Sequence, residues 1–409
     1  MSDLENNEKE VPVIMTDSQN KEVFAVSERY NRLLGIFSGM PFSINIIIGS
    51  GIFVLPGDVW RLTRSPKVAL IFWVIGGIIS FFGSLIYAEL GYMLPRGAGE
   101  LRYLEEAFPN FRKVIAHTFS VGMITIIRPA AIVGDTYICA HLGDAMIKVL
   151  YAYEGWNNVN YLVDELHSPR RNLVVSNIFS ILVSIVLYIL INISYIMIAA
   201  SNPAAATSMY TGDASKIIAI YFGEQIAGKI GNKLISALIA ISSFGAVGSM
   251  VFTGSRVIVY SSVAKFIPEY FAGWGLNAFP DNFLFNTPTK ALIAQFIYCS
   301  LLILFFPTGT SFFIFFATIS LYLTAIYYGA STVGLMILKE KYRGIKRPFK
   351  VRFLDVIFLV CIVLIAIAGF FPLPGSPLYY LPYVISWVAV ILGGISIYVY
   401  KGYKKTEIQ

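Results

Sequence analysis

The chain has 409 residues, of which 56% are hydrophobic and 13% are charged, and its formal net charge is +7. Soluble globular chains have roughly 45–50% apolar and about 25% charged residues, so this composition argues against a soluble enzyme, a nucleic-acid-binding protein and a disordered protein. Excess lysine and arginine is typical of the cytoplasmic loops of membrane proteins, so the charge does not indicate a nucleic-acid partner. We expect an all-α polytopic membrane protein embedded in the lipid bilayer.

The first 30 residues are polar and include seven acidic side chains. They lack the apolar core of a signal peptide, and their composition is typical of a disordered tail. Basic residues cluster on one predicted side of the membrane, which favours placing both termini in the cytosol. These clusters lie at residues 96–113, 170–171, 339–352 and 401–405. The predicted organisation is a cytosolic tail over 1–30, a membrane domain over 31–400 and a cytosolic tail over 401–409.

Long runs without Asp, Glu, Lys or Arg predict the membrane spans, because a helix needs about 20 apolar residues to cross the hydrocarbon core. Six runs are clear; the third ends in a loop after about residue 200, and the last two each divide at a proline-containing turn, which gives eight spans. Two weaker spans, 114–127 and 149–163, bring the total to about ten. The clear runs are 33–57, 68–88, 172–215, 234–255, 291–338 and 356–400.

Two of these spans contain residues that interrupt a helix. Gly49, Ser50 and Gly51 lie in the middle of the first span, and a carboxylate, a glycine and three asparagines lie within 151–160. Glycine frees the backbone from helical geometry, and an unwound turn at membrane depth persists only where protein or water satisfies its amides. Close helix packing is the alternative for the first segment, and a loop for the second. Together, two Gly-interrupted spans predict the substrate site of a transporter.

The chemistry of such a site follows from its two interruptions. Exposed N–H groups at 49–51 favour a carboxylate, and the carbonyl ends of the preceding half-helices favour an ammonium group, so a zwitterionic amino acid suits both. For Glu154, contact with the ammonium group, proton binding and a structural role held by backbone amides all stay open. No metal, cofactor, nucleotide or nucleophile motif is present, so we expect no cofactor, no metal and no enzyme. The residues expected to bind substrate are Ile48, Gly49, Ser50, Gly51, Ile52, Tyr151, Ala152, Glu154, Gly155, Trp156 and Asn157.

Three blocks carry a resemblance to one known family. Residues 48–53 read Ile-Gly-Ser-Gly-Ile-Phe, residues 87–91 read Tyr-Ala-Glu-Leu-Gly, and residues 153–161 read Tyr-Glu-Gly-Trp-Asn-Asn-Val-Asn-Tyr. This pattern resembles the L-type amino acid transporters of the amino acid–polyamine–organocation superfamily, and related fungal methionine permeases. The resemblance implies alternating-access transport of an amino acid (neutral, large neutral or methionine) across the plasma membrane. It also implies that Tyr151 is an aromatic gate over the substrate.

The resemblance implies twelve helices, of which the first ten form two inverted five-helix repeats. Only two spans lie between the two interruptions of this chain, where the repeat requires four. The residues that should lead into the second interruption, 135–148, carry two Asp, one His and one Lys. We therefore predict a deletion near 134–149 that removes helices four and five, and an amino-acid-permease fold with a truncated first repeat. The alternative function is a non-transporting nutrient sensor or an inactive truncated permease.

Two further expectations concern partners and the cytosolic face. The resemblance implies that a single-span glycoprotein subunit can attach through a cysteine after helix three. Cys139 lies near that region. Because the predicted deletion prevents a residue-by-residue match with the family there, Cys139 is not assigned to this attachment. Charged residues near 89–102 and 164–171 are expected to lie in a solvated loop, with a gate of ion pairs as the alternative.

Overall fold

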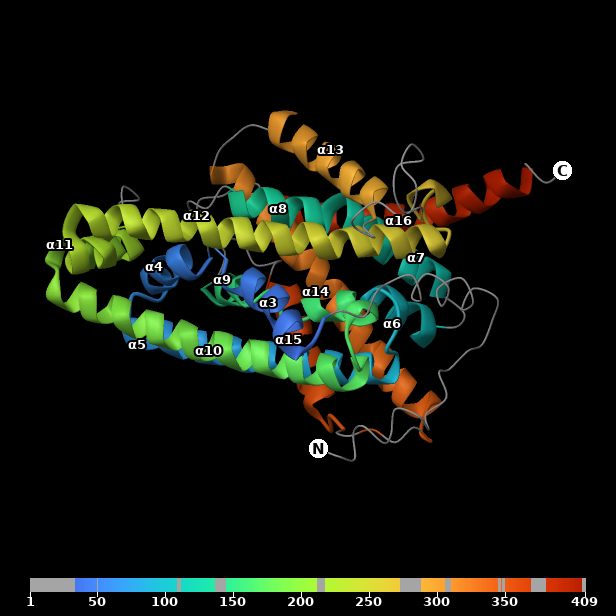
Figure 1. Cartoon of the computed structure of the whole chain (residues 1–409), viewed down its shortest axis with the longest axis horizontal. Helices are drawn as coiled ribbons and strands as arrows, with labels where there is room; N and C mark the ends of the chain where they lie inside the picture. Colours follow the sequence, from blue (N-terminus) through green and yellow to red (C-terminus); the bar gives the residue numbers. More distant parts are fainter. Residues whose placement is uncertain are drawn as a thin grey trace.

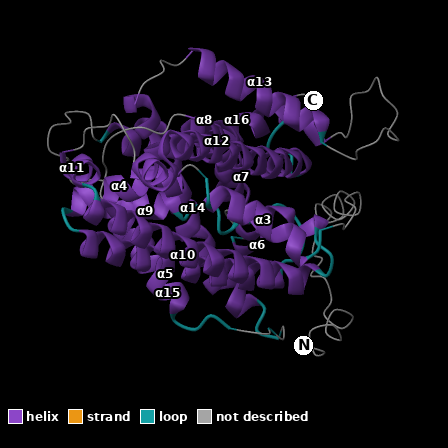
Figure 2. Cartoon of the chain, turned by 60° about the vertical axis from the view of Figure 1, so that its left-hand side comes forward, coloured by secondary structure: helices purple, strands orange, loops and turns teal. Residues whose placement is uncertain are grey.

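The computed structural model describes residues 34–49, 51–108, 112–136, 145–211, 218–272, 288–305, 310–344, 347, 350–368 and 380–406. These residues are almost entirely helical (Figure 2), and the only pairing of strand type among them is a bridge between Leu34 and Leu166. The predicted all-α class is confirmed. The elements are α3 (Ile36–Ile47), α4 (Gly51–Thr63), α5 (Pro66–Met93), α6 (Glu100–Ala107), α7 (Arg112–Gly122), η1 (Met123–Ile127), α8 (Arg128–Thr136), α9 (Ala145–Ala152), η2 (Asn158–Glu165), α10 (Pro169–Ser201), α11 (Pro203–Thr211), α12 (Ile218–Val263), η3 (Glu269–Ala272), α13 (Thr289–Phe305), α14 (Thr310–Lys341), α15 (Leu354–Ala368) and α16 (Leu381–Thr406).

The long helices α10 and α12 run along the longest axis of the molecule, with α11 at one end and α6 at the other (Figure 1). We call these the α11 end and the α6 end. Helix α10 packs along α5 and α3, and α12 packs on α3, α8 and α13. Large apolar side chains are exposed on the outer face of α10, such as Leu182, Val186 and Leu190. Lipid tails are as apolar as leucine, so this exposure suits a membrane-embedded face.

Five helices are long and apolar enough to cross a membrane, and α3 with α4 makes a sixth crossing that bends by 40° between them. Three shorter apolar helices lie in the last part of the chain, at Thr289–Phe305, Leu354–Ile367 and Leu381–Ser396. The pair α9 and η2 occupies the remaining predicted span and contains only short helices. Every predicted span is therefore at least partly helical among the described residues.

The loop that the sequence predicted after residue 200 is instead the helix α11. Asn202 begins it, because its side-chain oxygen accepts hydrogen bonds from the N–H groups of Ala204 at 3.0 Å and Ala205 at 3.2 Å. Pro203 follows, at a helix position where a missing N–H group costs nothing. Asparagine is among the preferred residues before the first turn of a helix, so the two residues together start a helix in a segment whose composition suggested a loop.

Two helices extend beyond their predicted ends. The predicted span 234–255 lies inside α12, which turns at Ala227 and Gly228 where the backbone is not helical. Helix α16 continues to Thr406, so most of the tail predicted over 401–409 is helical. Both predicted spans were ended at the first charged residue. A charged residue ends an apolar run in the sequence, but a helix can continue through it.

The helix that contains the weak span 114–127 is continuous, with a wider π-helical turn at Met123–Ile127. Pro129 has no N–H group to donate to the carbonyl oxygen of Thr125, four residues earlier. That oxygen instead accepts a hydrogen bond from the Tyr298 hydroxyl of α13 at 2.9 Å. Single π turns of this kind are frequent at functional sites, and this one directly precedes the buried Arg128.

Several charged residues at the α6 end form buried ion pairs, so the expectation of a solvated loop is wrong. Glu89, near the end of α5, is 1% exposed and lies 2.9 Å from Arg347 and 3.4 Å from Lys339. Glu165, at the end of η2, lies 2.7 Å from Arg256 of α12. Packed helices exclude water here, and a carboxylate taken out of water requires a cation or several hydrogen bonds. Ion pairs are therefore present at the α6 end, but their cations lie outside the segments of the alternative prediction, and a gate stays a prediction.

Candidate functional site

The two interruptions of the helices lie against each other in the middle of the molecule. The first break separates α3 from α4 between Ile47 and Gly51, and the second separates α9 from η2 between Ala152 and Asn158. A Cβ atom on Gly51 would lie 3.7 Å from the Cα atom of Ala152. The two unwound backbones are therefore in direct contact.

Gly155 brings the second break against the first. Its φ angle is +110°, a conformation that side-chain-bearing residues rarely adopt. A Cβ atom at this position would lie 2.5 Å from Cγ2 of Ile46 and 3.6 Å from the backbone nitrogen of Ile47. The glycine is therefore required both by the backbone conformation and by the close approach of α3.

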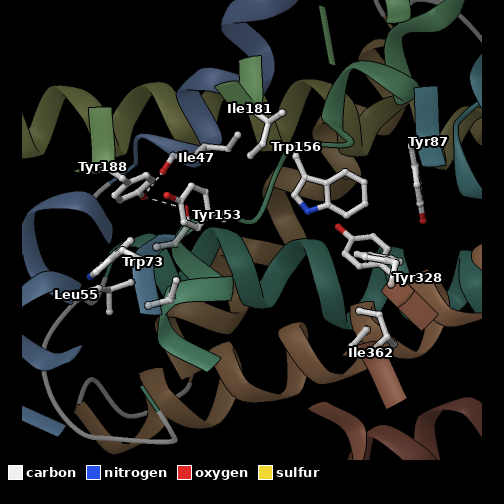
Figure 3. Packing of buried hydrophobic residues seen from close by; sticks show 14 of the residues in the cluster. Ile47, Leu55, Trp73, Tyr87, Tyr153, Trp156, Ile181, Tyr188, Tyr328 and Ile362 are labelled. Carbon is white, nitrogen blue, oxygen red and sulfur yellow. Dashed lines mark hydrogen bonds between the residues drawn. The ribbon is translucent and has the colours of Figure 1, made fainter. Parts of the chain in front are cut away.

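One tyrosine hydroxyl joins the two breaks. The hydroxyl of Tyr188, on α10, shares its proton between the carbonyl oxygens of Ile47 at 2.7 Å and Ala152 at 2.9 Å (Figure 3). Its ring is fully buried between Trp73 and Tyr153, with ring centroids 4.7 and 4.8 Å away. The hydroxyl satisfies two helix-end carbonyl groups at once, and a buried carbonyl group is costly to leave without a partner.

A serine hydroxyl occupies a third carbonyl at the first break. The Ser242 hydroxyl of α12 donates a short hydrogen bond to the carbonyl oxygen of Ile48. Several carbonyl groups expected to face an ammonium group therefore already accept hydrogen bonds from protein hydroxyls. Each carbonyl oxygen has two lone pairs, so one hydrogen bond from a hydroxyl does not use up its capacity to accept.

We expect Tyr188→Phe to destabilise the protein by about 1–3 kcal/mol, since it leaves the Ile47 and Ala152 carbonyl groups without their donor. The measurement is thermal unfolding of the purified protein in detergent. Tyr195→Phe is the matched control, because Tyr195 is buried on the same helix and its hydroxyl makes no hydrogen bond with the described residues. Equal melting temperatures for the two variants would contradict the bridging role of Tyr188.

A cavity with about 800 Å³ of empty space, including the part open to solvent, lies where the breaks meet. Its walls come from both breaks and from α6, α7, η1, α8, α12 and α14. Most residues of the predicted site line it, although their contact with a substrate stays a prediction. These residues are Gly49, Gly51, Tyr151, Ala152, Glu154, Gly155 and Asn157.

Three of the described residues predicted for the site do not line this cavity. Ile52 is fully buried in the main apolar core, and Ile48 packs against the same core. Trp156 lies between Tyr87 and Tyr328, with both ring centroids 4.9 Å away (Figure 3). Side chains on opposite sides of one turn point in different directions, so adjacency in sequence does not imply a shared cavity. The remaining predicted residue, Ser50, lies outside the described residues.

Several cavity residues were not predicted. Arg128 is buried, donates to the Asn158 side-chain oxygen at 3.1 Å and lies 5.1 Å from the ring centroid of Tyr161. Arginine next to an apolar run is a functional signal in a membrane segment, and this signal is visible in the sequence at the end of the weak span 114–127. Glu154 accepts a hydrogen bond from the Tyr328 hydroxyl of α14 at 2.5 Å, a contact between distant segments that no local pattern indicates.

Glu100 is the most unexpected residue of the cavity wall. It begins α6, was expected in a solvated loop, and is 1% exposed. The side-chain amide of Asn157 donates to Oε1 of Glu100 at 2.7 Å. This hydrogen bond connects the second break to the short helix at the α6 end, so the site and the ion-paired layer are in contact.

The sequence model of the amino acid permease family matches residues 34–134 and 130–396 of this chain. The chain belongs to the amino acid permease family. The resemblance predicted from the three sequence blocks is confirmed, and this permease is a multi-pass integral membrane protein. The two matched segments overlap at residues 130–134. This overlap lies next to residues 134–149, where we predict the deletion. The deletion itself stays a prediction, and residues 137–144 lie outside the described part of the chain.

Curated relatives are amino acid transporters. Asc-type amino acid transporter 1 of Mus musculus is 25% identical over 417 residues, which cover 80% of this chain and 74% of the relative. The b(0,+)-type amino acid transporter 1 of Homo sapiens is 24% identical over 404 residues, covering 78% of each chain. Large neutral amino acids transporter small subunit 2 of Mus musculus is 25% identical over 417 residues, covering 80% of this chain and 74% of the relative.

Proposed function

We propose that this permease transports a neutral amino acid, of the large neutral or methionine type, by alternating access. The observation that carries the proposal is the meeting of two interrupted helices at one cavity, with Gly49 and Gly51 on one side and Ala152 and Gly155 on the other. The start of α4 offers N–H groups to a carboxylate, and the ends of α3 and α9 offer carbonyl groups to an ammonium group. An amino acid supplies both charges.

The rest of the cavity wall supports a large apolar side chain on the substrate. Phe119, Met123, Ile127, Tyr151 and Met250 all line the cavity. Ligand pockets are lined mainly by apolar and aromatic side chains, with a few polar groups that fix orientation. The side chains of leucine and methionine suit such an apolar wall. Tyr151 lines the cavity, which supports the proposal that it acts as the aromatic gate.

The test is uptake of radiolabelled leucine and methionine into proteoliposomes that contain this 409-residue chain. We expect saturable uptake by the wild type and loss of uptake in Gly51→Trp, because an indole at this position fills the contact with Ala152. Gly248→Trp is the matched control: Gly248 is exposed on α12, and a Cβ atom there meets nothing within 4 Å. This control should transport like the wild type.

The opposite result would favour the second candidate, a non-transporting sensor or an inactive truncated permease. That result is uptake no better than in empty liposomes from monodisperse, folded protein. The basis for this candidate is that the described residues between the breaks contain two membrane-spanning candidates, Pro66–Met93 and Val114–Ile132, where the resemblance implies four helices. Binding of leucine by such a protein, measured by a shift in melting temperature, would then separate a sensor from an inactive product.

Location and partners extend the proposal. The basic clusters favour the cytosol for the α6 end and for both termini. The resemblance to the L-type transporters favours the plasma membrane for the protein. One relative is by its name the small subunit of a transporter, and we propose that this permease likewise accepts a second, single-span glycoprotein subunit. Cys139, considered for that attachment, lies outside the described residues.

A further inference from the structure

A second cavity lies beside the central one, between η1, α12, η3 and α13. It has about 770 Å³ of empty space, including the part open to its surroundings, and the central cavity has about 800 Å³. Met123 and Arg128 line both, so they lie between the two cavities. Apolar side chains from all four elements make up most of the wall of the second cavity. Among them are Ile124, Val257, Phe271 and Ala294.

Gln295 of α13 places a polar group in this apolar wall. The side chain is 6% exposed, and its amide makes no hydrogen bond with the described residues; its Oε1 is buried without a partner. The amide lies against the backbone of α12 at Gly254, because a Cβ atom on that glycine would lie 2.6 Å from Nε2 and 3.1 Å from Oε1 of Gln295. A buried polar group without a partner is costly, so the amide requires a partner from whatever fills the cavity.

Arg128, the charged residue in the same wall, is directed toward the central cavity. Its guanidinium donates to the side-chain oxygen of Asn158 at 3.1 Å and lies 5.1 Å from the ring centroid of Tyr161. Both of these partners line the central cavity and do not line the second one. The amide of Gln295 is therefore the main polar group that the second cavity offers to a ligand.

The second cavity opens toward the lipid. Thr125 and Tyr298 line it, both are exposed, and they belong to the predicted spans 114–127 and 291–338. Their hydroxyl groups already donate within the protein: Thr125 to the carbonyl oxygen of Val121 at 2.6 Å, and Tyr298 to that of Thr125 at 2.9 Å. A ligand that enters here comes from the hydrocarbon phase, so it is a lipid-soluble molecule.

We infer that the second cavity binds a lipid-soluble alcohol, a molecule with an apolar body and one hydroxyl group. A hydroxyl group both donates and accepts hydrogen bonds, so it suits the oxygen and the N–H groups of the Gln295 amide. A plain acyl chain would fill the apolar space and leave the amide without a partner. A water molecule would satisfy the amide but needs about two to four polar partners, and it would leave most of the space unfilled. This site is separate from the one that we propose for the amino acid.

The test is photolabelling of the full chain in phosphatidylcholine vesicles with an octanol that carries a diazirine, followed by mass spectrometry of the labelled peptides. We expect label on the peptides that contain residues 268–271 and 294–298. Unlabelled octanol should displace this label at about a tenfold lower concentration in the bilayer than octane, because only the alcohol supplies hydrogen bonds. Vesicles with added diacylglycerol separate two sources of the ligand: displacement by this lipid indicates a lipid of the bilayer, and no displacement indicates a smaller free alcohol.

Two variants locate the hydroxyl group and the apolar body. Gln295→Leu should remove the advantage of octanol over octane, since leucine fills a similar space without an amide. Gln225→Leu, the same change at an exposed glutamine of α12, should keep this advantage. Ala294→Trp should prevent labelling of the second cavity, because the indole fills it from α13.

Three results from the wild type alone would overturn the inference, so it stays testable even if a variant does not fold. Equal displacement by octane and octanol would mean that the cavity takes up any apolar chain. Stronger displacement by octanoate than by octanol would assign the cavity to a carboxylate. Label confined to residues of the central cavity, displaced by leucine, would mean that the second cavity does not bind the alcohol.

Discussion

Gly155→Ala is expected to abolish amino acid uptake and to lower the melting temperature of the protein. The methyl group would force a residue with φ +110° into a conformation that alanine rarely adopts, and would lie 2.5 Å from Cγ2 and 2.7 Å from Cβ of Ile46. Each effect costs about 1–3 kcal/mol. Relief requires the second break to move away from α3, and this movement opens the contact on which the cavity depends. Uptake into proteoliposomes and thermal unfolding in detergent measure the two effects.

The matched control is Gly248→Ala, an added methyl group of the same size on the exposed face of α12. Its Cβ atom would meet nothing within 4 Å, and its backbone is helical. We expect wild-type uptake and a slightly raised melting temperature, since alanine is favoured over glycine in a helix by about 1 kcal/mol. Wild-type transport by Gly155→Ala would contradict the packing of the second break against α3.

The parts of the fold that depend on local composition followed from the sequence. Apolar runs predicted the spans, and glycines within such runs predicted both breaks, because a long apolar segment and a glycine each act through the few residues around them. The order of the spans on either side of the breaks also agrees with the structure. Local composition failed at Asn202, where a single capping side chain starts a helix in a segment that otherwise resembles a loop.

The candidate site was predictable in its backbone and much less so in its side chains. Gly49, Gly51 and Gly155 were identified because a break requires them. Tyr188 and Glu100 were missed, although they contact the breaks directly. Tyr188 is 36 residues from Ala152, and Glu100 is 57 residues from Asn157. Such contacts depend on how helices pack, and a tyrosine in an apolar helix has no local feature that separates a bridging hydroxyl from a lipid-facing one.

Arg347→Met is expected to destabilise the protein by about 3 kcal/mol, the lower end of the range for breaking a buried ion pair. Glu89 would lose the guanidinium nitrogen at 2.9 Å and keep Lys339 at 3.4 Å and the N–H group of Val351 at 3.0 Å. These remaining partners place the effect at the lower end. The melting temperature in detergent reports the change, and Arg343→Met is the control. Arg343 and Glu340 are 75% and 67% exposed, and exposed pairs contribute about 0–1 kcal/mol.

A double variant separates the net contribution of the Glu89–Arg347 ion pair to stability from the cost of leaving one buried charge without its partner. Glu89→Gln together with Arg347→Met removes both charges, and we expect it to recover part of the stability lost in Arg347→Met, because the buried carboxylate is gone. The two effects should be non-additive, as for any pair of residues in contact. If Arg347→Met melted no earlier than Arg343→Met, the layer at the α6 end would be no more than a set of surface charges. If the double variant melted earlier than the wild type, the pair as a whole would stabilise the packing of α5 against the segment that follows α14, which is the property that a gate of ion pairs requires.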